Sequence, residues 1–198
     1  MARKLKKRTL GNNYLDSWNY LKESKKFIFL IFLIFLLFIL IGLFIPAPES
    51  ISQEIFKYIQ ELIEKTEGMG FFELFWFIFF NNLEVSFIGM LSGVIFGILP
   101  LLIGISNGYL LGFVSYLVVK EQSFFSLWRI FPHGIFELPA IFISLGLGLK
   151  LGMFIFQKKK VKYLKQNLSK SLQTFFLIVV PLLILAAIIE SIFIFVMG

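Results

Sequence analysis

Residues 27–45 read FIFLIFLIFLLFILIGLFI, a run of 19 residues without a charge. As a helix rising 1.5 Å per residue, this run matches a bilayer hydrocarbon core about 30 Å thick. A secretory signal peptide would have a shorter apolar region followed by a small-residue cleavage site, whereas residues 43–50 read LFIPAPES. The run therefore predicts a transmembrane helix of the mature protein.

The composition of the whole chain extends this interpretation. Of its 198 residues, 58% are hydrophobic and 27 are phenylalanines, whereas soluble domains are closer to half apolar. We expect an all-α, polytopic helical membrane protein with about five transmembrane helices, including interrupted helices, and an extracytoplasmic amphipathic helix. A basic cytoplasmic segment, residues 1–26, would precede a single transmembrane domain, residues 27–198. The expected spans lie at about 27–45, 71–98, 101–119, 127–156 and 171–197.

The polar segment after the first span has the pattern of a surface helix. Isoleucine and leucine recur there at helical spacing, opposite glutamates and a lysine. Ser50 and Gln53 fit a capping box, and Gly68 and Gly70 mark the end of the segment. We expect a helix over about residues 50–66 that lies on the bilayer or packs on the bundle.

The formal net charge of +7 is concentrated next to the predicted spans. Eight of the 19 basic residues precede Phe27, and six more lie in residues 158–170, a predicted loop without acidic residues. Such clusters face the anionic cytoplasmic leaflet, so we expect contacts with the lipid bilayer and anionic lipids, and none with nucleic acid. The positive-inside rule then predicts a multi-pass protein of the cell membrane with a cytoplasmic N-terminus and an extracytoplasmic C-terminus.

Glycine spacing suggests how residues 71–119 fold. These 49 residues carry only two charges, Glu73 and Glu84, which suits two spans joined by a tight turn. Two glycine triplets with a spacing of four residues are mirror images about the Pro100–Leu101 bond. Small residues allow close helix contact in lipid, so we expect an antiparallel hairpin with the triplets face to face. The predicted helix-packing positions are Gly89, Gly93, Gly97, Gly104, Gly108 and Gly112, with Ser144, Gly148 and Gly152 of the fourth span.

Polar side chains within the predicted spans form a second group. A carboxylate in the bilayer is costly unless it is paired, protonated or hydrated. We therefore expect these groups to face one another inside the bundle, between the midplane and the outer leaflet. The predicted intramembrane polar site consists of Asn81, Asn82, Glu84, Asn107, His133, Glu137 and Glu190.

Prolines and a glycine predict interruptions of the helices, most of them in FPHGIFELPA, residues 131–140. Pro139 lacks a backbone donor and disfavours helical geometry just before it, while Gly134 allows another backbone to approach. The asparagine side chains would then pair with the backbone groups that a break frees. The predicted helix breaks are Pro100, Pro132, Gly134 and Pro139.

Two interpretations of the polar site stay open. Either it lines a path for an ion, a proton or a small polar solute, as broken helices do in transporters, or it caps broken helices and fixes the register of the bundle. Catalysis is not expected, because the only aspartate, Asp16, precedes the first span. The chain also has only one histidine and no cysteine. We expect no enzymatic activity, no cofactor and no metal site.

Three segments, in this order, resemble the stage II sporulation protein M (SpoIIM) family: NNLEVSFIGMLSGVIFG (81–97), NGYLLG (107–112) and FPHGIFELPAIFIS (131–144). The family's Pro-His-Gly-x-x-Glu-x-Pro core matches residues 132–139, and its asparagine and Asn-Gly elements match Asn82 and Asn107–Gly108. The resemblance covers about residues 72–152 and implies a polytopic, non-enzymatic membrane protein. Members from sporulating bacteria form a complex with peptidoglycan-remodelling partners, and the family extends to non-sporulating bacteria and archaea.

These observations lead to two hypotheses of function. The first is a non-enzymatic membrane scaffold or partner-binding subunit, which self-associates and contacts a membrane or envelope protein. The alternative is a transporter or channel for an ion, a proton or a small polar solute that uses the His/Glu/Asn belt. A cavity that reaches Glu137 would favour transport, whereas a dry packed network would favour the scaffold.

Overall fold

The computed structural model describes residues 10–45, 47–121, 123, 125, 127 and 131–197, with only the backbone of residues 131–133 and 197. Within these ranges the chain is predominantly helical and has no strand. Five of the described helical segments are long and apolar enough to cross a membrane: Leu10–Phe44, Phe71–Val94, Ile98–Glu121, Gly134–Phe156 and Lys160–Val196. The expected all-α fold with five membrane-spanning helices is confirmed.

The bundle is built from α1 (Leu10–Phe44), α3 (Phe71–Leu91), α4 (Ile98–Glu121), α5 (Phe131–Gly152) and α7 (Val180–Met197). Two further helices are α2 (Glu49–Thr66), between α1 and α3, and α6 (Lys160–Thr174), before α7. Short 3-10 segments follow α3 (η1, Ser92–Val94) and α5 (η3, Met153–Phe156), and a π-helical segment (η4, Phe175–Val179) joins α6 to α7.

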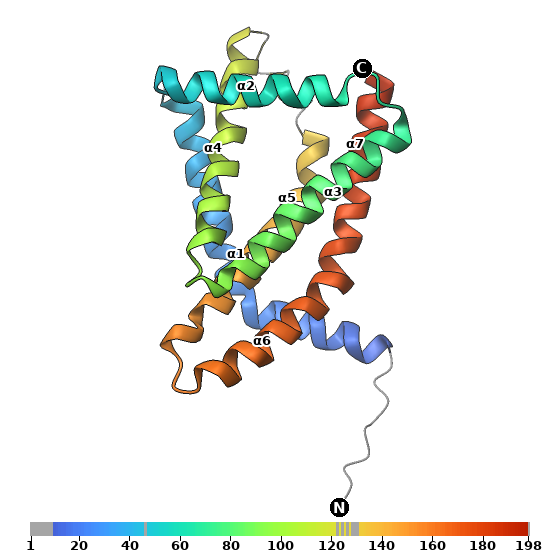
Figure 1. Cartoon of the computed structure of the whole chain (residues 1–198). Coiled ribbons are helices and arrows are strands. Elements are labelled where there is room, and N and C mark those ends of the chain that lie inside the picture. Colours follow the sequence, from blue (N-terminus) through green and yellow to red (C-terminus); the bar gives the residue numbers. More distant parts are fainter. Residues whose placement is uncertain are drawn as a thin grey trace, which may run out of the picture.

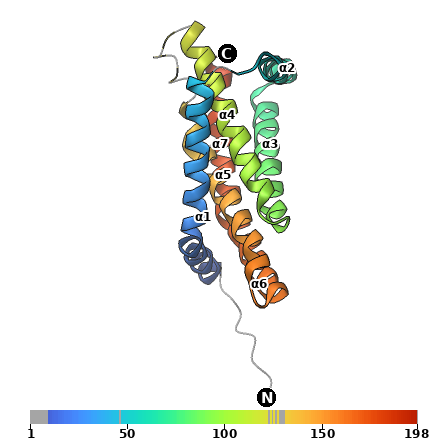
Figure 2. The same ribbon diagram turned by 90° about the vertical axis from the view of Figure 1, so that its left-hand side faces the viewer.

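Helix α5 is the centre of the bundle. Figures 1 and 2 show α1 and α4 side by side, α7 on the opposite side, and α3 crossing obliquely over α5. Every residue from 144 to 152 is buried, because α1, α3, α4 and α7 all pack against α5. Apart from Lys150, this stretch consists of leucine, glycine and serine, and a helix whose sides are nearly all apolar or small is expected to be enclosed in this way.

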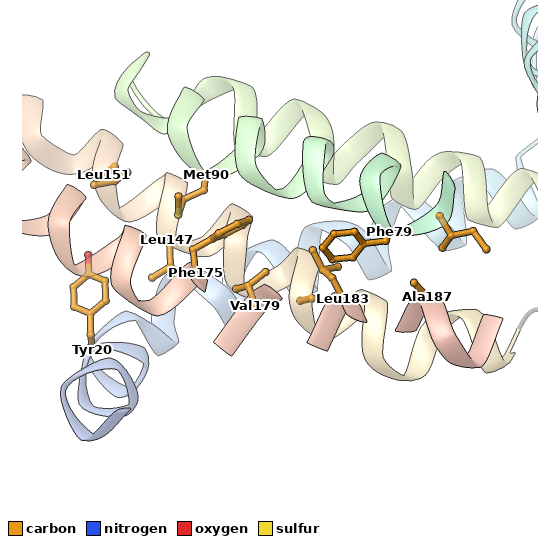
Figure 3. Close-up of a cluster of buried hydrophobic side chains, with 11 residues drawn as sticks. Tyr20, Phe79, Met90, Leu147, Leu151, Phe175, Val179, Leu183 and Ala187 are labelled. Atoms are coloured by element: carbon orange, nitrogen blue, oxygen red, sulfur yellow. The ribbon is translucent and has the colours of Figure 1, made fainter. Parts of the chain in front are cut away.

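The largest apolar cluster joins α5 to α3 and the C-terminal helix, as Figure 3 shows. Leu147 and Leu151 of α5 are fully buried, and so are Met90 of α3 and Phe175 of η4. In lipid such contacts are favoured by van der Waals packing rather than by removal of apolar surface from water. Close fit therefore determines which helices become neighbours.

The turn between α3 and α4 does not lie where the glycine symmetry predicts it. The chain turns at residues 92–97, where Phe96 and Gly97 have positive φ angles of 55° and 73°. Pro100 is already in the first turn of α4, where a backbone N–H would have no intrahelical partner and proline is well tolerated. The predicted turn at the Pro100–Leu101 bond, and the predicted break at Pro100, are wrong.

The predicted breaks at Gly134 and Pro139 are wrong as well, because both residues lie within α5, which is continuous from Phe131 to Gly152. Pro132 is the second residue of α5, and residues 128–130 lie outside the described part of the chain, so the break predicted there stays a prediction. Membrane helices tolerate an internal proline because neighbouring groups compensate for the lost hydrogen bond. At Gly134 the nearest described atom to an added Cβ is Leu138 Cδ1 of the same helix, at 3.2 Å, and not another backbone.

The glycine triplets do form close helix contacts, but not with each other. The α3 triplet faces α5: a Cβ at Gly93 would overlap the carbonyl of Gly148. The α4 triplet faces α1: a Cβ at Gly108 would lie 2.6 Å from the carbonyl oxygen of Phe35. The expected face-to-face hairpin is therefore wrong, because small residues permit close approach without selecting the partner. The remaining contacts are Gly89 with Leu145, Gly97 with Leu149 and Gly152, Gly104 with Ile31 and Leu145, and Gly112 with Ile39.

The two ends of the bundle differ in character. The predicted surface helix is present as α2, which has no buried residue and crosses one end of the bundle (Figure 1). At the opposite end, helix α6, whose sequence is rich in lysine, lies beside the first part of α1 (Figure 1). Residues 160–170, predicted as a loop, are helical, and α1 begins at Leu10, well before the predicted span.

Candidate functional site

A cavity of about 640 Å³ lies between α1, α4, α5 and α7. Three residues of the predicted polar site line it, each from a different helix: Asn107 from α4, Glu137 from α5 and Glu190 from α7. Ser115 of α4 adds a hydroxyl group, and the rest of the wall is mostly apolar. The structure thus brings together polar groups that lie 30 and 53 residues apart along the sequence.

Local helix geometry positions these groups. Asn107 and Ser115 are eight residues apart and so lie on the same face of α4. The Asn107 Nδ2 atom donates a hydrogen bond to the carbonyl of Ile103 (2.8 Å), and the Ser115 hydroxyl donates one to the carbonyl of Leu111 (2.7 Å). These bonds hold both side chains against their own helix. The sequence predicted that Asn107 would pair with backbone groups of α5. Its amide nitrogen instead bonds to the backbone of its own helix, α4.

The chemistry of the cavity is that of a hydrogen-bond acceptor site. Glu137 is 5% exposed and Glu190 is partly buried. Ionised carboxylates accept hydrogen bonds only, and the amide of Asn107 adds a carbonyl oxygen. Such a wall favours a proton, a small cation or a solute with donor groups over an anion.

The other members of the predicted site are not brought to this cavity. Asn82 of α3 is buried, whereas Asn81 and Glu84 are exposed on the outer surface of α3. The expectation that they face the bundle interior is therefore wrong for Asn81 and Glu84. The Asn81 amide lies 3.4 Å from the Asn82 Oδ1 atom. The side chain of His133 lies outside the described residues.

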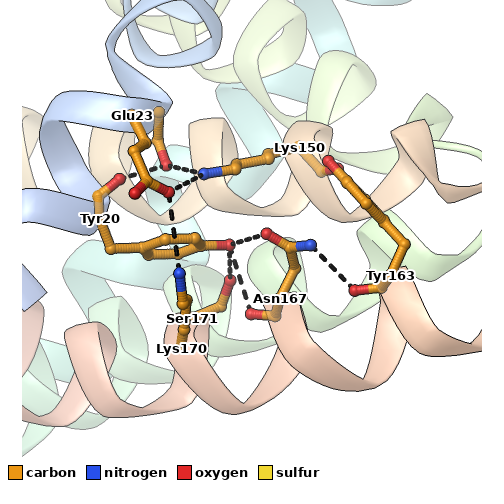
Figure 4. Close-up of polar contacts among 8 residues, drawn as sticks. Tyr20, Glu23, Lys150, Tyr163, Asn167, Lys170 and Ser171 are labelled. Atoms are coloured by element: carbon orange, nitrogen blue, oxygen red, sulfur yellow. Dashed lines mark hydrogen bonds and ion pairs between the residues drawn. The ribbon is translucent and has the colours of Figure 1, made fainter. Parts of the chain in front are cut away.

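A second polar cluster lies at the basic end of the bundle and was missed by sequence reasoning (Figure 4). Lys150 of α5 has a buried side chain whose Nζ atom is 3.7 Å from the centroid of the Tyr20 ring. The same atom donates a hydrogen bond to Ser24 (3.0 Å) and is 3.6 Å from a carboxylate oxygen of Glu23. Figure 4 shows these groups of α1 converging on the lysine.

The cluster continues from Tyr20 into α6. The Tyr20 hydroxyl is 3.1 Å from both the Asn167 Oδ1 atom and the Ser171 hydroxyl. Asn167 in turn donates to the carbonyl of Tyr163 (2.9 Å). The network therefore links α1, α5 and α6 at one end of the bundle. A signal for it was present in the sequence, because Lys150 is the only lysine between the end of α4 and the basic segment at 158–170.

No group of three or more histidine, aspartate or glutamate side chains that could hold a metal ion occurs in the part of the chain that the structure describes. The polar groups at both ends of the bundle are instead amides, hydroxyls, lysines and carboxylates on separate helices.

The five spanning helices and the polar groups between them define a multi-pass helical membrane protein. The chain belongs to the stage II sporulation protein M (SpoIIM) family, whose model matches residues 31–193. It is 30% identical over 116 residues to an uncharacterized protein of Methanocaldococcus jannaschii, a match that covers 56% of this chain and 65% of that protein. No solved structure matches the chain. The resemblance noted in residues 72–152 is confirmed and extends from α1 to α7.

Proposed function

We propose that the protein binds a proton or a small cation in the cavity between α1, α4, α5 and α7, and conducts or carries it across the membrane. The observation that carries this proposal is the convergence of Asn107, Glu137 and Glu190 on one cavity. Ionisable residues inside a membrane protein mark ion and proton pathways when they face a cavity. The proposed transport needs no covalent chemistry and no cofactor.

The cavity favours this function over a purely structural role for the polar residues. A dry network that only fixed the register of the helices would leave no space beside the carboxyl groups. The cavity has a volume of about 640 Å³, many times the volume of roughly 30 Å³ that one water molecule occupies. Two carboxyl groups, one from α5 and one from α7, line the cavity, and a carboxyl group attracts a cation when it is ionised.

The experiment is a flux measurement in vesicles that contain the purified protein and an internal pH-sensitive dye. A potassium diffusion potential drives protons inward, and separate vesicles test sodium and potassium with cation-sensitive dyes. We expect Glu137→Gln and Glu190→Gln to lower the flux at least tenfold. Glu54→Gln, on the exposed face of α2, is the control with the same change in charge and should leave the flux unchanged.

Two results would contradict the proposal. One is a wild-type flux no greater than that of protein-free vesicles with any of these ions. The other is a flux that survives both cavity substitutions unchanged. Size-exclusion chromatography of each variant establishes that a lost flux does not arise from a lost fold.

The scaffold is the second candidate function, and α2 is the observation that favours it. This helix of 18 residues has no buried residue, and Ile51 and Ile63 are exposed beside its charged face. A membrane or envelope protein docked there would cover both side chains. A photo-crosslinker at Ile63 should then give a protein adduct in cells that is absent when the crosslinker replaces Lys57, and adducts with lipid alone would count against this role.

The orientation in the membrane follows from charge. The part of α1 that carries Lys25 and Lys26 lies at the same end of the bundle as α6, since Lys170 of α6 is 3.9 Å from Glu23 of α1. The positive-inside rule assigns this end to the cytoplasm, with anionic lipids as neighbours. The C-terminus and α2 are then extracytoplasmic. A cysteine at position 61 should react with a membrane-impermeant maleimide in intact cells, and one at position 162 should not.

A further inference from the structure

The outer surface of α3 carries polar groups at the depth where lipid is least able to accept them. Asn81 and Glu84 flank the midpoint of the spanning segment Phe71–Val94 and are both exposed. They are three residues apart and thus lie on one face of the helix. Trp76, Phe80 and Ile88 lie on the same surface and are each at least half exposed.

Rotation of α3 cannot bring these groups inward. The opposite face of α3 is fixed by Gly89, which lies against Leu145, and the η1 segment that follows is fixed by Gly93, which lies against the backbone of Gly148. Asn82 and Ser86 also lie on this inner face and are buried. Apart from the 3.4 Å contact of Asn81 with its neighbour Asn82, neither Asn81 nor Glu84 makes a hydrogen bond or ion pair within the described part of the chain.

We propose that this face of α3 is the contact between two copies of the chain in the membrane. A carboxyl group and an amide at mid-bilayer are unfavourable beside lipid tails, which offer neither donors nor acceptors. A second protein surface would satisfy both groups. The inference is independent of solute binding, because neither residue lines the cavity.

A second copy has the required chemistry. Two copies inserted in the same orientation and related by a two-fold axis along the membrane normal place their α3 helices at equal depth. The Asn81 amide both donates and accepts, so it can bond to Asn81 or Glu84 of the other copy, one helical turn away. Asparagine and other polar side chains that bond across helices are a known source of association in lipid. The aromatic rings beside them supply packing area on either side.

The absence of cysteine in the sequence permits a direct test. In purified full-length protein reconstituted into phosphatidylcholine vesicles, Ile88→Cys introduces one thiol on the proposed contact face, four residues after Glu84. We expect oxidation to convert most of this variant to a covalent dimer. Leu185→Cys of α7 is the matched control, with 46% exposure against 51% for Ile88, and should form at least tenfold less dimer.

A second variant tests the polar groups themselves. Asn81→Leu with Glu84→Leu, added to Ile88→Cys, should lower dimer formation at least tenfold. The monomer should stay folded, because these side chains make no interhelical hydrogen bond or ion pair within its described part. Two outcomes would overturn the proposal: equal crosslinking at positions 88 and 185, or dimer formation that the double substitution leaves unchanged.

Discussion

Gly93 of η1, just after α3, and Gly148 of α5 lie backbone against backbone. A Cβ atom at Gly93 would overlap the Gly148 carbonyl, and one at Gly148 would lie 2.6 Å from the carbonyl oxygen of Gly89. The atoms in the way belong to the backbone, so they cannot move aside as a flexible side chain would. This contact seats α3 on α5, and it also fixes which face of α3 is left outside.

The first prediction concerns this contact. Gly93→Ala should lower the free energy of unfolding by about 1–3 kcal/mol, the usual cost of inserting a methyl group into a packed interior. The measurement is a denaturant titration in detergent micelles. Gly11→Ala is the control, because no atom lies within 4 Å of a Cβ at Gly11. Equal stability of the two variants would contradict the observed packing.

The second prediction separates the observed helix neighbours from those suggested by the glycine symmetry. A Cβ at Gly104 would lie 3.8 Å from Ile31 Cγ2, an ordinary contact distance. The pair Ile31→Cys with Gly104→Cys should therefore form an intramolecular disulfide between α1 and α4. The pair Gly93→Cys with Gly108→Cys should form no such disulfide, because these two positions face each other only in the hairpin predicted from the sequence. Diagonal electrophoresis of protease fragments reports both, and the reverse result would restore the predicted hairpin.

The third prediction concerns Lys150. Lys150→Met should destabilise the protein by about 2 kcal/mol, because it removes a desolvated cation from the face of the Tyr20 ring. Lys170→Met is a closely matched control. Its Nζ atom is 3.9 Å from the same Glu23 and 5.4 Å from the same ring centroid, but its side chain is 56% exposed.

The Lys170 substitution should therefore cost less than about 1 kcal/mol, as exposed ion pairs do. Thermal unfolding followed by circular dichroism gives both values. Lys150→Arg should retain part of the stability, since arginine also stacks on aromatic rings. Equal losses at positions 150 and 170 would show that burial at Lys150 contributes nothing.

The fourth prediction tests the cavity by filling it rather than by changing its charge. Val114 lines the cavity, so Val114→Trp should lower the proposed flux at least tenfold while both carboxyl groups stay in place. Leu102→Trp on the exposed surface of the same helix is the control. Flux in the vesicle assay is the measurement, and an unaffected Val114 variant would mean that the solute does not pass through this space.

Part of the candidate site could be predicted from the sequence. Asn107, Glu137 and Glu190 were all expected near one another because a buried polar group needs a polar or hydrated neighbour, and they do line one cavity. The same rule failed for Asn81 and Glu84, since it assumes that a single chain must satisfy every polar group it places in the membrane. Lys150 was overlooked, although a lysine in a row of buried small and apolar residues is an unusual feature.

By itself the sequence determined that the chain crosses the membrane about five times, that an amphipathic helix follows the first span, and that basic residues flank particular spans. These properties depend on the length, period and charge of local segments, which the bilayer selects directly. Only the tertiary structure decided that α3 packs on α5 and α4 on α1, where the chain turns, and which polar residues share a cavity. The physical reason is that lipid gives helices no hydrophobic drive to associate, so a glycine stripe permits many partners and the combined fit of all the helices selects one.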